Sequence, residues 1–444
     1  MVSEYVNKFM QQKLFFKIAF ILFLILLLMI PNLLIQNLIL ERQGLEYQTQ
    51  NEIASSWGPN QTMIGPVLSI PFTKEITTDD GISTFEYTLR VLPKTINLEV
   101  SLDTQERQKS IYKVILYNAA HELDGLFEIP DLSKFGKNVK SIHWDNATVD
   151  FGFTSSASLD EIVYLEWNSE SYKMQSGASD NNLFSSAIHA AIPLSEEQKE
   201  YSFKTTIGLN GSKAINYLPL AENTSVSMNS NWTAPGFIGL PLPSNRDMTD
   251  VGFSAQWKLT EYNRAFKNTW IDNEVQLMHR AGTFGVDLVQ TVGHYQKNMR
   301  SAKYALLIIS LSFMVFFFFE MLKGNRIHFV QYIFVGLALS IFYTLLLSFS
   351  EHIGFDLAYL VSAGAVVGLI SWYSRFILHK GSNVFILTLI LGGLYLYIYI
   401  LLQMEEFALL VGSVGLFIVL AVTMYLSRHF NWYDLSGRKD EVEG

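Results

Sequence analysis

The sequence predicts an α+β membrane protein. Six transmembrane helices are expected, one N-terminal and five C-terminal, with a large extracytoplasmic, mainly-β, sandwich-like domain inserted between the first and second spans. Three observations carry this prediction: six long apolar runs, a stretch of water-soluble composition at residues 41–300, and Lys and Arg that are concentrated in alternate loops. Charged residues are only 16% of the chain, whereas soluble domains are about a quarter charged. An ordinary soluble enzyme and a disordered chain are therefore excluded.

The first apolar run, residues 14–40, is predicted to be an uncleaved signal-anchor. A helix needs roughly 20 apolar residues to cross the hydrocarbon core, and this run is longer than the roughly 7–15 residues of a cleavable signal. No small-residue cleavage site follows Pro31-Asn32. Lys17 lies near the cytoplasmic end, where its amine is expected to reach the headgroups. Helical spacing continues from Leu45 to Trp57, and Gly58-Pro59 ends the helix.

Beyond Pro59 the apolar residues alternate with polar ones, which predicts β-strands. Strands are expected at residues 67–72, 84–91, 96–102, 112–118, 148–153, 162–167, 201–209, 224–232 and 252–259. Nine or ten strands with few helices indicate a β-sandwich or two stacked sheets, in one domain or two. Asn168–Asn182, rich in Ser and Asn, is expected to be a surface loop.

The other spans are expected at residues 304–321, 330–350, 355–374, 384–403 and 407–426. The predicted organisation is then 1–40 (cytoplasmic N-terminus and signal-anchor), 41–300 (β-rich domain with a helical stalk at each end), 301–426 (five-helix bundle) and 427–444 (cytoplasmic tail). Gly364 and Gly368 form a GxxxG pattern that predicts close helix packing. Tyr395, Tyr397 and Tyr399 are expected to hydrogen-bond between helices rather than line a lipid groove.

Orientation follows from the short loops, because Lys and Arg favour the cytoplasmic side. With the N-terminus inside, ten basic residues fall on inner segments: Lys8, Lys13, Lys17, Lys323, Arg326, Arg375, Lys380, Arg428, Arg438 and Lys439. The two short outer loops, 351–355 and 403–406, contain none. Both termini are therefore predicted to be cytoplasmic and residues 41–300 exported.

No catalytic, cofactor-binding or metal-binding residue is predicted, and no cofactor. The chain contains no cysteine, which excludes thiolate metal sites and disulfides. His121-Glu122 is followed by Leu-Asp-Gly and lacks the second histidine of a zinc protease helix. No P-loop, dinucleotide or hydrolase motif occurs. The net charge of −9 argues against nucleic acid as a partner.

A candidate functional rim lies at the outer ends of the spans, at Glu351, His352, Asp356, Arg300 and Lys303. Charged groups cost little at headgroup level, so interfacial anchoring is the simpler interpretation. The same interpretation covers Glu320, also at a span end. The alternative is acid–base chemistry by the two carboxylates and the histidine.

Several stretches resemble the CreD family of bacterial inner-membrane proteins nearly from end to end. They include 52–58, 61–68, 116–119, 230–239, 252–257, 284–287, 295–305, 313–320, 328–343 and 345–360, with the rim sequence Ser350-Glu-His-Ile-Gly-Phe355. Phe329 and Gly236 depart from the family pattern, where Pro and Ser are expected. The resemblance implies an inner-membrane protein associated with cell-envelope integrity, often controlled by an envelope-responsive two-component system. It implies no defined activity and no catalytic residue.

Three classes of function follow. The leading one is a non-enzymatic envelope protein whose exported domain contacts an envelope protein or polymer, with membrane lipids as further partners. The second is a lipid or amphiphile transporter resembling a flippase, because the spans lack mid-membrane charges but a lipid path does not need them. The third is a membrane enzyme using the rim. The oligomeric state stays open.

The junction before the second span also carries an expectation. Residues 295–300 are polar but contain Tyr295, which suggests that the second helix extends beyond the bilayer, as the first does. Two such extensions are expected to form a rigid stalk, with Arg300 and Lys303 at outer headgroup level. Cysteines placed within 45–57 and 294–300 are expected to crosslink.

Overall fold

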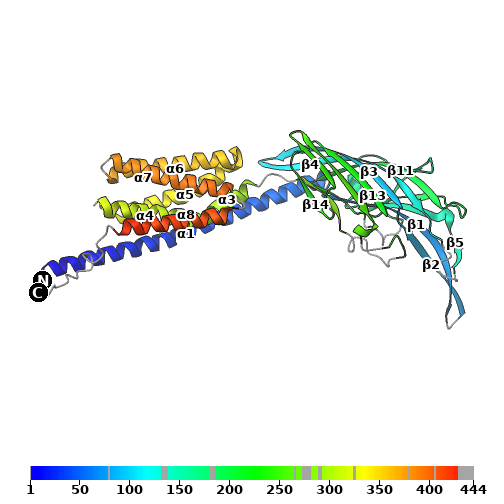
Figure 1. Cartoon of the computed structure of the whole chain (residues 1–444), viewed down its shortest axis with the longest axis horizontal. Coiled ribbons are helices and arrows are strands. Elements are labelled where there is room, and N and C mark those ends of the chain that lie inside the picture. Colours follow the sequence, from blue (N-terminus) through cyan, green and yellow to red (C-terminus); the bar gives the residue numbers. More distant parts are fainter. Residues whose placement is uncertain are drawn as a thin grey trace. The chain divides into compact units, whose positions relative to one another are not determined.

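The computed structural model divides into two units: Met1–Leu45 with Val292–Gly444, called the membrane unit, and Glu46–Thr291, called the β unit. Elements are labelled in Figure 1. The structure describes all residues except 1, 79–80, 132–138, 180–183, 185, 265–266, 273–281, 289–292, 324–326, 379–380, 405–406 and 429–444.

Helix α1 (Val2–Trp57) contributes to both units and ends before Gly58-Pro59, as the sequence predicts. Its last turns belong to the β unit, where they pack on the strands β3 (Thr95–Lys109) and β4 (Tyr112–Glu128). Gln50 donates to the Lys113 carbonyl at 2.9 Å, and the Trp57 indole donates to the Tyr117 carbonyl at 3.1 Å. These bonds make the end of the helix part of the β unit.

The β unit contains two sheets, which confirms the predicted sandwich-like class. The ten-stranded first sheet has the order β14-β18-β12-β1-β6-β10-β9. Outside this order, β2 and β5 each pair with β1, and β17 pairs with β2. Its strands are β1 (Gln61–Thr78), β2 (Gly81–Val91), β5 (Val139–Ile142), β6 (Ala147–Phe153), β9 (Gln175–Ser176), β10 (Ala187–Ile192), β12 (Ala214–Tyr217), β14 (Pro235–Gly239), β17 (Thr269–Ile271) and β18 (Phe284–Leu288).

The eight-stranded second sheet has the order β15-β16-β13-β3-β4-β11-β7-β8. Besides β3 and β4 it contains β7 (Tyr164–Trp167), β8 (Glu170–Lys173), β11 (Glu200–Ser212), β13 (Asn223–Ser230), β15 (Asn245–Thr249) and β16 (Gly252–Thr260). Most neighbours are antiparallel, but β13 pairs with β3 in parallel. Every strand expected from the sequence is present in one of the two sheets.

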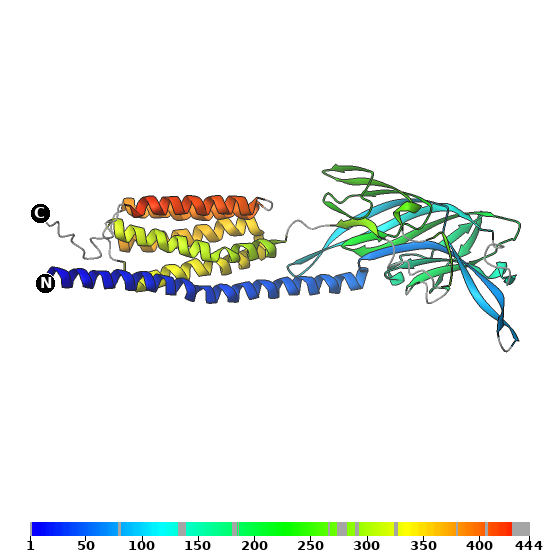
Figure 2. The same cartoon turned by 60° about the horizontal axis from the view of Figure 1, so that its bottom comes forward.

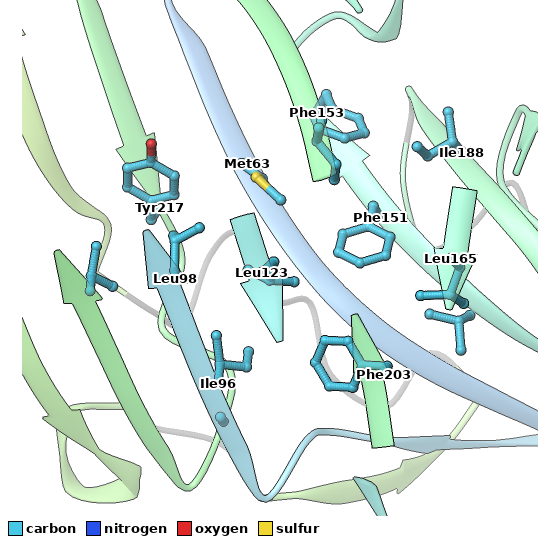
Figure 3. Packing of buried hydrophobic residues seen from close by; sticks show 14 of the residues in the cluster. Met63, Ile96, Leu98, Leu123, Phe151, Phe153, Leu165, Ile188, Phe203 and Tyr217 are labelled. Atoms are coloured by element: carbon cyan, nitrogen blue, oxygen red, sulfur yellow. The ribbon is translucent and has the colours of Figure 1, made fainter. Parts of the chain in front are cut away.

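The two sheets share one hydrophobic core (Figure 3). Met63 and Phe151 enter it from the first sheet, and Leu98, Leu123 and Phe203 from the second. Burial alternates along β3 and β11, because successive strand side chains point to opposite faces. The opposite faces of these strands in the second sheet are therefore free to carry polar residues.

The expected loop at Asn168–Asn182 is wrong in part. It contains β8 and β9, and β7 turns into β8 through Asn168 and Ser169, whose φ angles are 47° and 72°. Two consecutive residues with positive φ suit a tight hairpin turn between twisted strands. The sequence hid these strands because β8 and β9 are short and almost entirely exposed, so they lack apolar alternation.

The membrane unit contains α1 and the helices α3 (His294–Lys303), α4 (Ala305–Lys323), α5 (Phe329–Ile353), α6 (Phe355–Leu378), α7 (Gly381–Gln403) and α8 (Ala408–Ser427). Among the described residues, five helices are long and apolar enough to cross a membrane, and α3 with α4 forms a bent sixth candidate. All five C-terminal spans lie within about two to four residues of their expected bounds, the usual scatter of helix ends. Figure 2 shows α8 along the outside of the bundle.

Helix α3 does not extend the second span in a straight line, because α3 and α4 are bent by 46°. Tyr295, Asn298 and Ser301 of α3 are buried within the membrane unit. Their polar groups need partners there, and α5 supplies two of them. The helical lead-in to the second span is therefore present as α3, but it is bent relative to α4. The stalk and its crosslinks remain a prediction.

The GxxxG glycines of the bundle differ from expectation. A Cβ at Gly364 or Gly368 would meet no heavy atom within 4 Å, so the GxxxG pattern packs against nothing described in this chain. At Gly336 a Cβ would collide with Leu28 of α1, and at Gly415 with the Tyr397 hydroxyl. Close helix packing is therefore made at these two positions.

Candidate functional site

Glu351, at the C-terminal end of α5, is held by side chains from two other helices. The Tyr295 hydroxyl of α3 donates to its carboxylate at 2.9 Å, and the Arg42 Nε of α1 lies 3.9 Å away. Between the same two helices α3 and α5, the Asn298 amide donates to Ser350 Oγ at 2.6 Å. The Glu351 side chain is only 10% exposed. This carboxylate fastens α1 and α3 to α5.

Asp356 lies in the first turn of α6, where a helix N-terminus favours negative charge. It accepts hydrogen bonds from the Tyr399 hydroxyl at 3.2 Å and from the Gln403 amide, both on α7. Gln403 in turn accepts a hydrogen bond from the Lys297 amine of α3 at 3.1 Å. Gly354, with φ 76°, makes the turn between α5 and α6 that brings the rim together.

The other rim residues differ in their surroundings. His352 is exposed at the end of α5. Arg300 is half-buried on α3, and Lys303 is exposed at the last turn of the same helix. Helix α3 therefore connects the two carboxylates, because its Tyr295 contacts Glu351 and its Lys297 reaches Asp356 through Gln403. His352 and Lys303 are exposed.

The hydrogen-bond partners of Glu351 and Asp356 indicate a structural role for the rim. Each carboxylate receives hydroxyl or amide donors and bridges different helices. Charge-assisted hydrogen bonds of this kind are stronger than those between neutral groups. The arrangement suits a clamp of α1, α3, α5, α6 and α7.

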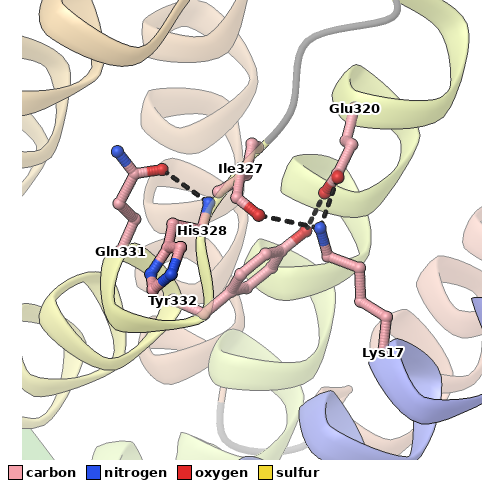
Figure 4. A network of polar contacts seen from close by, with 6 residues as sticks. All are labelled: Lys17, Glu320, Ile327, His328, Gln331 and Tyr332. Atoms are coloured by element: carbon pink, nitrogen blue, oxygen red, sulfur yellow. Dashed lines mark hydrogen bonds and ion pairs between the residues drawn. The ribbon is translucent and has the colours of Figure 1, made fainter. Parts of the chain in front are cut away.

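A second polar network joins α1, α4 and α5 at the other end of the spans (Figure 4). The Lys17 amine forms an ion pair with Glu320 and donates to the Ile327 carbonyl at 2.8 Å. The Tyr332 hydroxyl donates to the second Glu320 oxygen at 3.2 Å, and its ring centroid lies 5.5 Å from the amine. Both charged side chains are 15% exposed.

The expectation that Lys17 reaches the headgroups leaves out its partners within the unit. Its amine finds a carboxylate, a carbonyl and an aromatic face inside the unit. Glu320 likewise acts as a partner in this network rather than as an interfacial anchor alone. The sequence places both residues at span ends but does not show which end meets which helix.

His121 lies on β4 and is completely buried. Its Nδ1 lies 2.9 Å from the Ile207 carbonyl and its Nε2 2.9 Å from the Tyr217 hydroxyl. A neutral ring that donates from Nδ1 and accepts at Nε2 satisfies both contacts. Burial lowers the pKa of His121 to about 4. The residue therefore pins strands β4, β11 and β12 in its neutral form.

A buried polar cluster that sequence reasoning missed lies on the other side of the first sheet. Arg90 is fully buried and donates to Ser69 Oγ. Asp150 accepts from the Ser69 hydroxyl at 3.4 Å, and from the Ser179 backbone at 2.7 Å and hydroxyl at 2.6 Å. Arg90, Ser69 and Asp150 alternate along their strands with residues of the shared core, so they lie on the opposite face of the first sheet. The cluster fixes the segment around Ser179 on the sheet.

The outward face of the second sheet carries a polar row. Ser101, Asn229, Ser254 and Asp247 are register partners across β3, β13, β16 and β15. Directly paired residues of neighbouring strands lie on the same face. The row lines a hollow of about 520 Å³, called the polar hollow, together with Leu102, Asp103, Ser230, Asn231, Thr249, Val251, Gly252 and Phe253.

The edge of the polar hollow is held in place by Asn231. Its amide donates to Asp103 Oδ1 at 2.8 Å, and its carbonyl accepts from the Thr104 backbone at 2.9 Å. Val251 is 81% exposed beside it. The hollow thus combines hydroxyls, amides and carboxylates with an apolar contact.

Signals for some of the missed residues exist in the sequence. Tyr295, Asn298 and Ser301 recur at helical spacing, which marks one buried face of α3. The row across β3, β13, β16 and β15 has no such signal, because strand order and register are set by tertiary pairing. Two of the three tyrosines of α7 follow expectation: Tyr397 donates to the Val411 carbonyl and Tyr399 to Asp356. The buried Tyr395 hydroxyl has no hydrogen-bond partner among the described residues.

The sequence model of the family described as "Inner membrane protein CreD" matches residues 13–433. The protein of the same description from Escherichia coli (strain K12) is 28% identical over 389 residues, which cover 86% of this chain and 85% of the relative. The match thus includes both units.

Similarity to solved structures is weak. An M1 zinc metallopeptidase from Deinococcus radiodurans gives a TM-score of 0.20 at 6% identity and covers 45% of this chain and 42% of its own. A putative protease from Parabacteroides distasonis gives 0.23 at 7% identity, with 68% and 58% covered. Such scores support no inference about fold or activity.

Proposed function

Because the chain belongs to the CreD family of inner membrane proteins, we propose that it is a non-enzymatic envelope protein whose β unit is exported and contacts a hydroxyl-bearing envelope polymer. The chain is a multi-pass inner-membrane protein linked to the envelope.

The polar hollow carries the proposal. Serine hydroxyls and asparagine amides both donate and accept hydrogen bonds, and carboxylates accept them. This mixture matches a polymer whose hydroxyls also do both. Asp103 and Asp247 make the hollow acidic, which disfavours anionic polymers. Exposed Val251 offers contact to the apolar face of a sugar ring.

The loop charges support export of the β unit. Lys and Arg concentrate on the segments that would then be cytoplasmic, and the Glu351–Phe355 turn carries no Lys or Arg. The membrane unit would serve as the anchor. Its rim carboxylates support a structural role, because each is held by donors from other helices.

Complementation of an envelope defect tests this function. In cells lacking the chain, Asn229→Arg combined with Ser254→Arg is expected to abolish complementation, because two long cations fill the polar hollow. Thr206→Arg, an exposed position on β11 of the same face, is the matched control and should complement fully. Glu351→Gln with Asp356→Asn should also complement, since the amides preserve the acceptors.

Two outcomes count against the proposal when membrane levels are equal. Full complementation by the Asn229/Ser254 double variant would remove the polar hollow from the function. Loss of complementation by the Glu351/Asp356 amide variant, with normal folding, would favour rim chemistry instead.

A further inference from the structure

An apolar groove runs between α4, α7 and α8 inside the membrane unit. Its volume is about 610 Å³. Leu311 and Met314 line it from α4, Ile390 from α7, and Val419 and Val422 from α8. No residue of α8 among those described is fully buried, so the helix has few contacts within its own chain. The groove separates α8 from α4 and α7 along the side chains that line it.

The groove offers no free polar group to a ligand. Tyr397 and Thr423 are its polar lining residues. The Tyr397 hydroxyl donates to the Val411 carbonyl at 2.8 Å, and the Thr423 hydroxyl donates to the Val419 carbonyl at 2.7 Å. An ion or a polar solute would lose its hydration without replacement. Only hydrocarbon fits this chemistry.

The length of the groove suits a chain-like molecule. Its wall on α4 runs from Leu307 to Phe319. At about 1.5 Å per residue this is about 18 Å, which exceeds half of the roughly 30 Å hydrocarbon core. Helices α7 and α8 are candidate membrane-spanning segments, and α4 forms a bent candidate with α3, so lipid tails are the expected medium around the groove.

The walls are less suited to a helix from a second copy. Helices approach closely in membranes through small residues such as Gly, Ala and Ser. The groove is lined by Leu, Met, Phe, Ile and Val, and its one glycine, Gly415, already receives the Tyr397 hydroxyl. A flexible acyl chain can follow such walls, whereas close helix approach in membranes is favoured by small residues.

We propose that this groove is a binding site for one acyl chain of a membrane phospholipid, which completes the packing of α8 on α4 and α7. The site goes beyond the proposed function and does not depend on the polar hollow. It also adds a lining role to Tyr397, whose hydroxyl is used between helices while its ring faces the groove.

Photocrosslinking of the full chain tests the site. A benzophenone amino acid is placed at Ile390, in the groove, or at Leu389, which is 64% exposed on the same helix. The protein is purified from membranes, washed extensively in detergent and irradiated, and adducts are identified by mass spectrometry. Phospholipid adducts are expected at least about fivefold more often at Ile390 than at Leu389, because a lipid held in the groove exchanges slowly.

Blocking variants complete the experiment. Val419→Trp fills the groove and is expected to remove the Ile390 adduct, whereas Leu420→Trp, at a 57% exposed neighbouring position, should preserve it. Equal lipid adducts at Ile390 and Leu389 would overturn the proposal. So would an Ile390 adduct to a peptide of a second copy, which would make the groove a subunit interface.

Discussion

Lys17→Ala is expected to lower the free energy of unfolding of the membrane unit by about 3 kcal/mol, because it leaves the mostly buried Glu320 carboxylate with one neutral donor, the Tyr332 hydroxyl. The lost contacts include an ion pair, a hydrogen bond to the Ile327 carbonyl and cation–π contacts with the Tyr332 and Phe329 rings. Loss of helical circular dichroism during titration from mild detergent into SDS measures the change.

Two controls separate the ion pair from general damage. Arg42→Ala removes a partner of Glu351 that lies 3.9 Å from the carboxylate, and the Arg42 side chain is itself 43% exposed. A solvated partner at this distance typically contributes under about 1 kcal/mol. Lys17→Met with Glu320→Leu removes both charges and should cost less than Lys17→Ala. If Lys17→Ala unfolds at the wild-type SDS fraction, the pair contributes no stability and the account of α1 docking is wrong.

Acidification is expected to destabilise the β unit through His121 by about 3 kcal/mol between pH 6.5 and pH 4. Burial lowers its pKa in the folded state, so protons bind the unfolded state more readily. The full stability is therefore present above pH 6.5, falls as the pH approaches 4, and levels off below that value. Thermal unfolding followed by tryptophan fluorescence measures this, since Trp57, Trp144, Trp167, Trp232, Trp257 and Trp270 lie in the β unit.

The comparison with His121→Gln isolates this contribution from the carboxylates. Glutamine cannot take up a proton in this range, so the variant should lose less stability on acidification than wild type, although it is less stable at pH 7.5. His143→Gln, at a half-buried surface position, should retain the wild-type pH dependence. Parallel pH profiles of wild type and His121→Gln would refute the proposed burial effect.

The sequence predicts the spans and long strands because their signals are local. Apolar length identifies α5 to α8, Gly58-Pro59 ends α1, and alternation identifies β3 and β11. Short exposed strands such as β8 and β9 carry no alternation and are missed. The bend between α3 and α4 is missed because Tyr295 and Asn298 are drawn to α5 by tertiary hydrogen bonds.

The candidate site is predicted in part for the same reason. Glu351 and Asp356 are recognisable as charges at span ends, but their partners Tyr295 and Tyr399 come from helices distant in the sequence. Lys17 and Glu320 are separated by 303 residues. No periodic pattern links such pairs. The polar hollow depends on the register of four strands, one of which, β15, is short and fully exposed.

Crosslinking in living cells tests the central claim, contact of the exported β unit with a hydroxyl-bearing envelope polymer, most directly. A photoreactive amino acid at Asn229, in the polar hollow, is compared with one at Thr206, on the same sheet face but outside the hollow. We expect Asn229 to capture glycan-containing material that carbohydrate-cleaving enzymes release, and Thr206 to capture much less. Equal capture at the two positions, or capture at Asn229 of protein alone, would contradict the account.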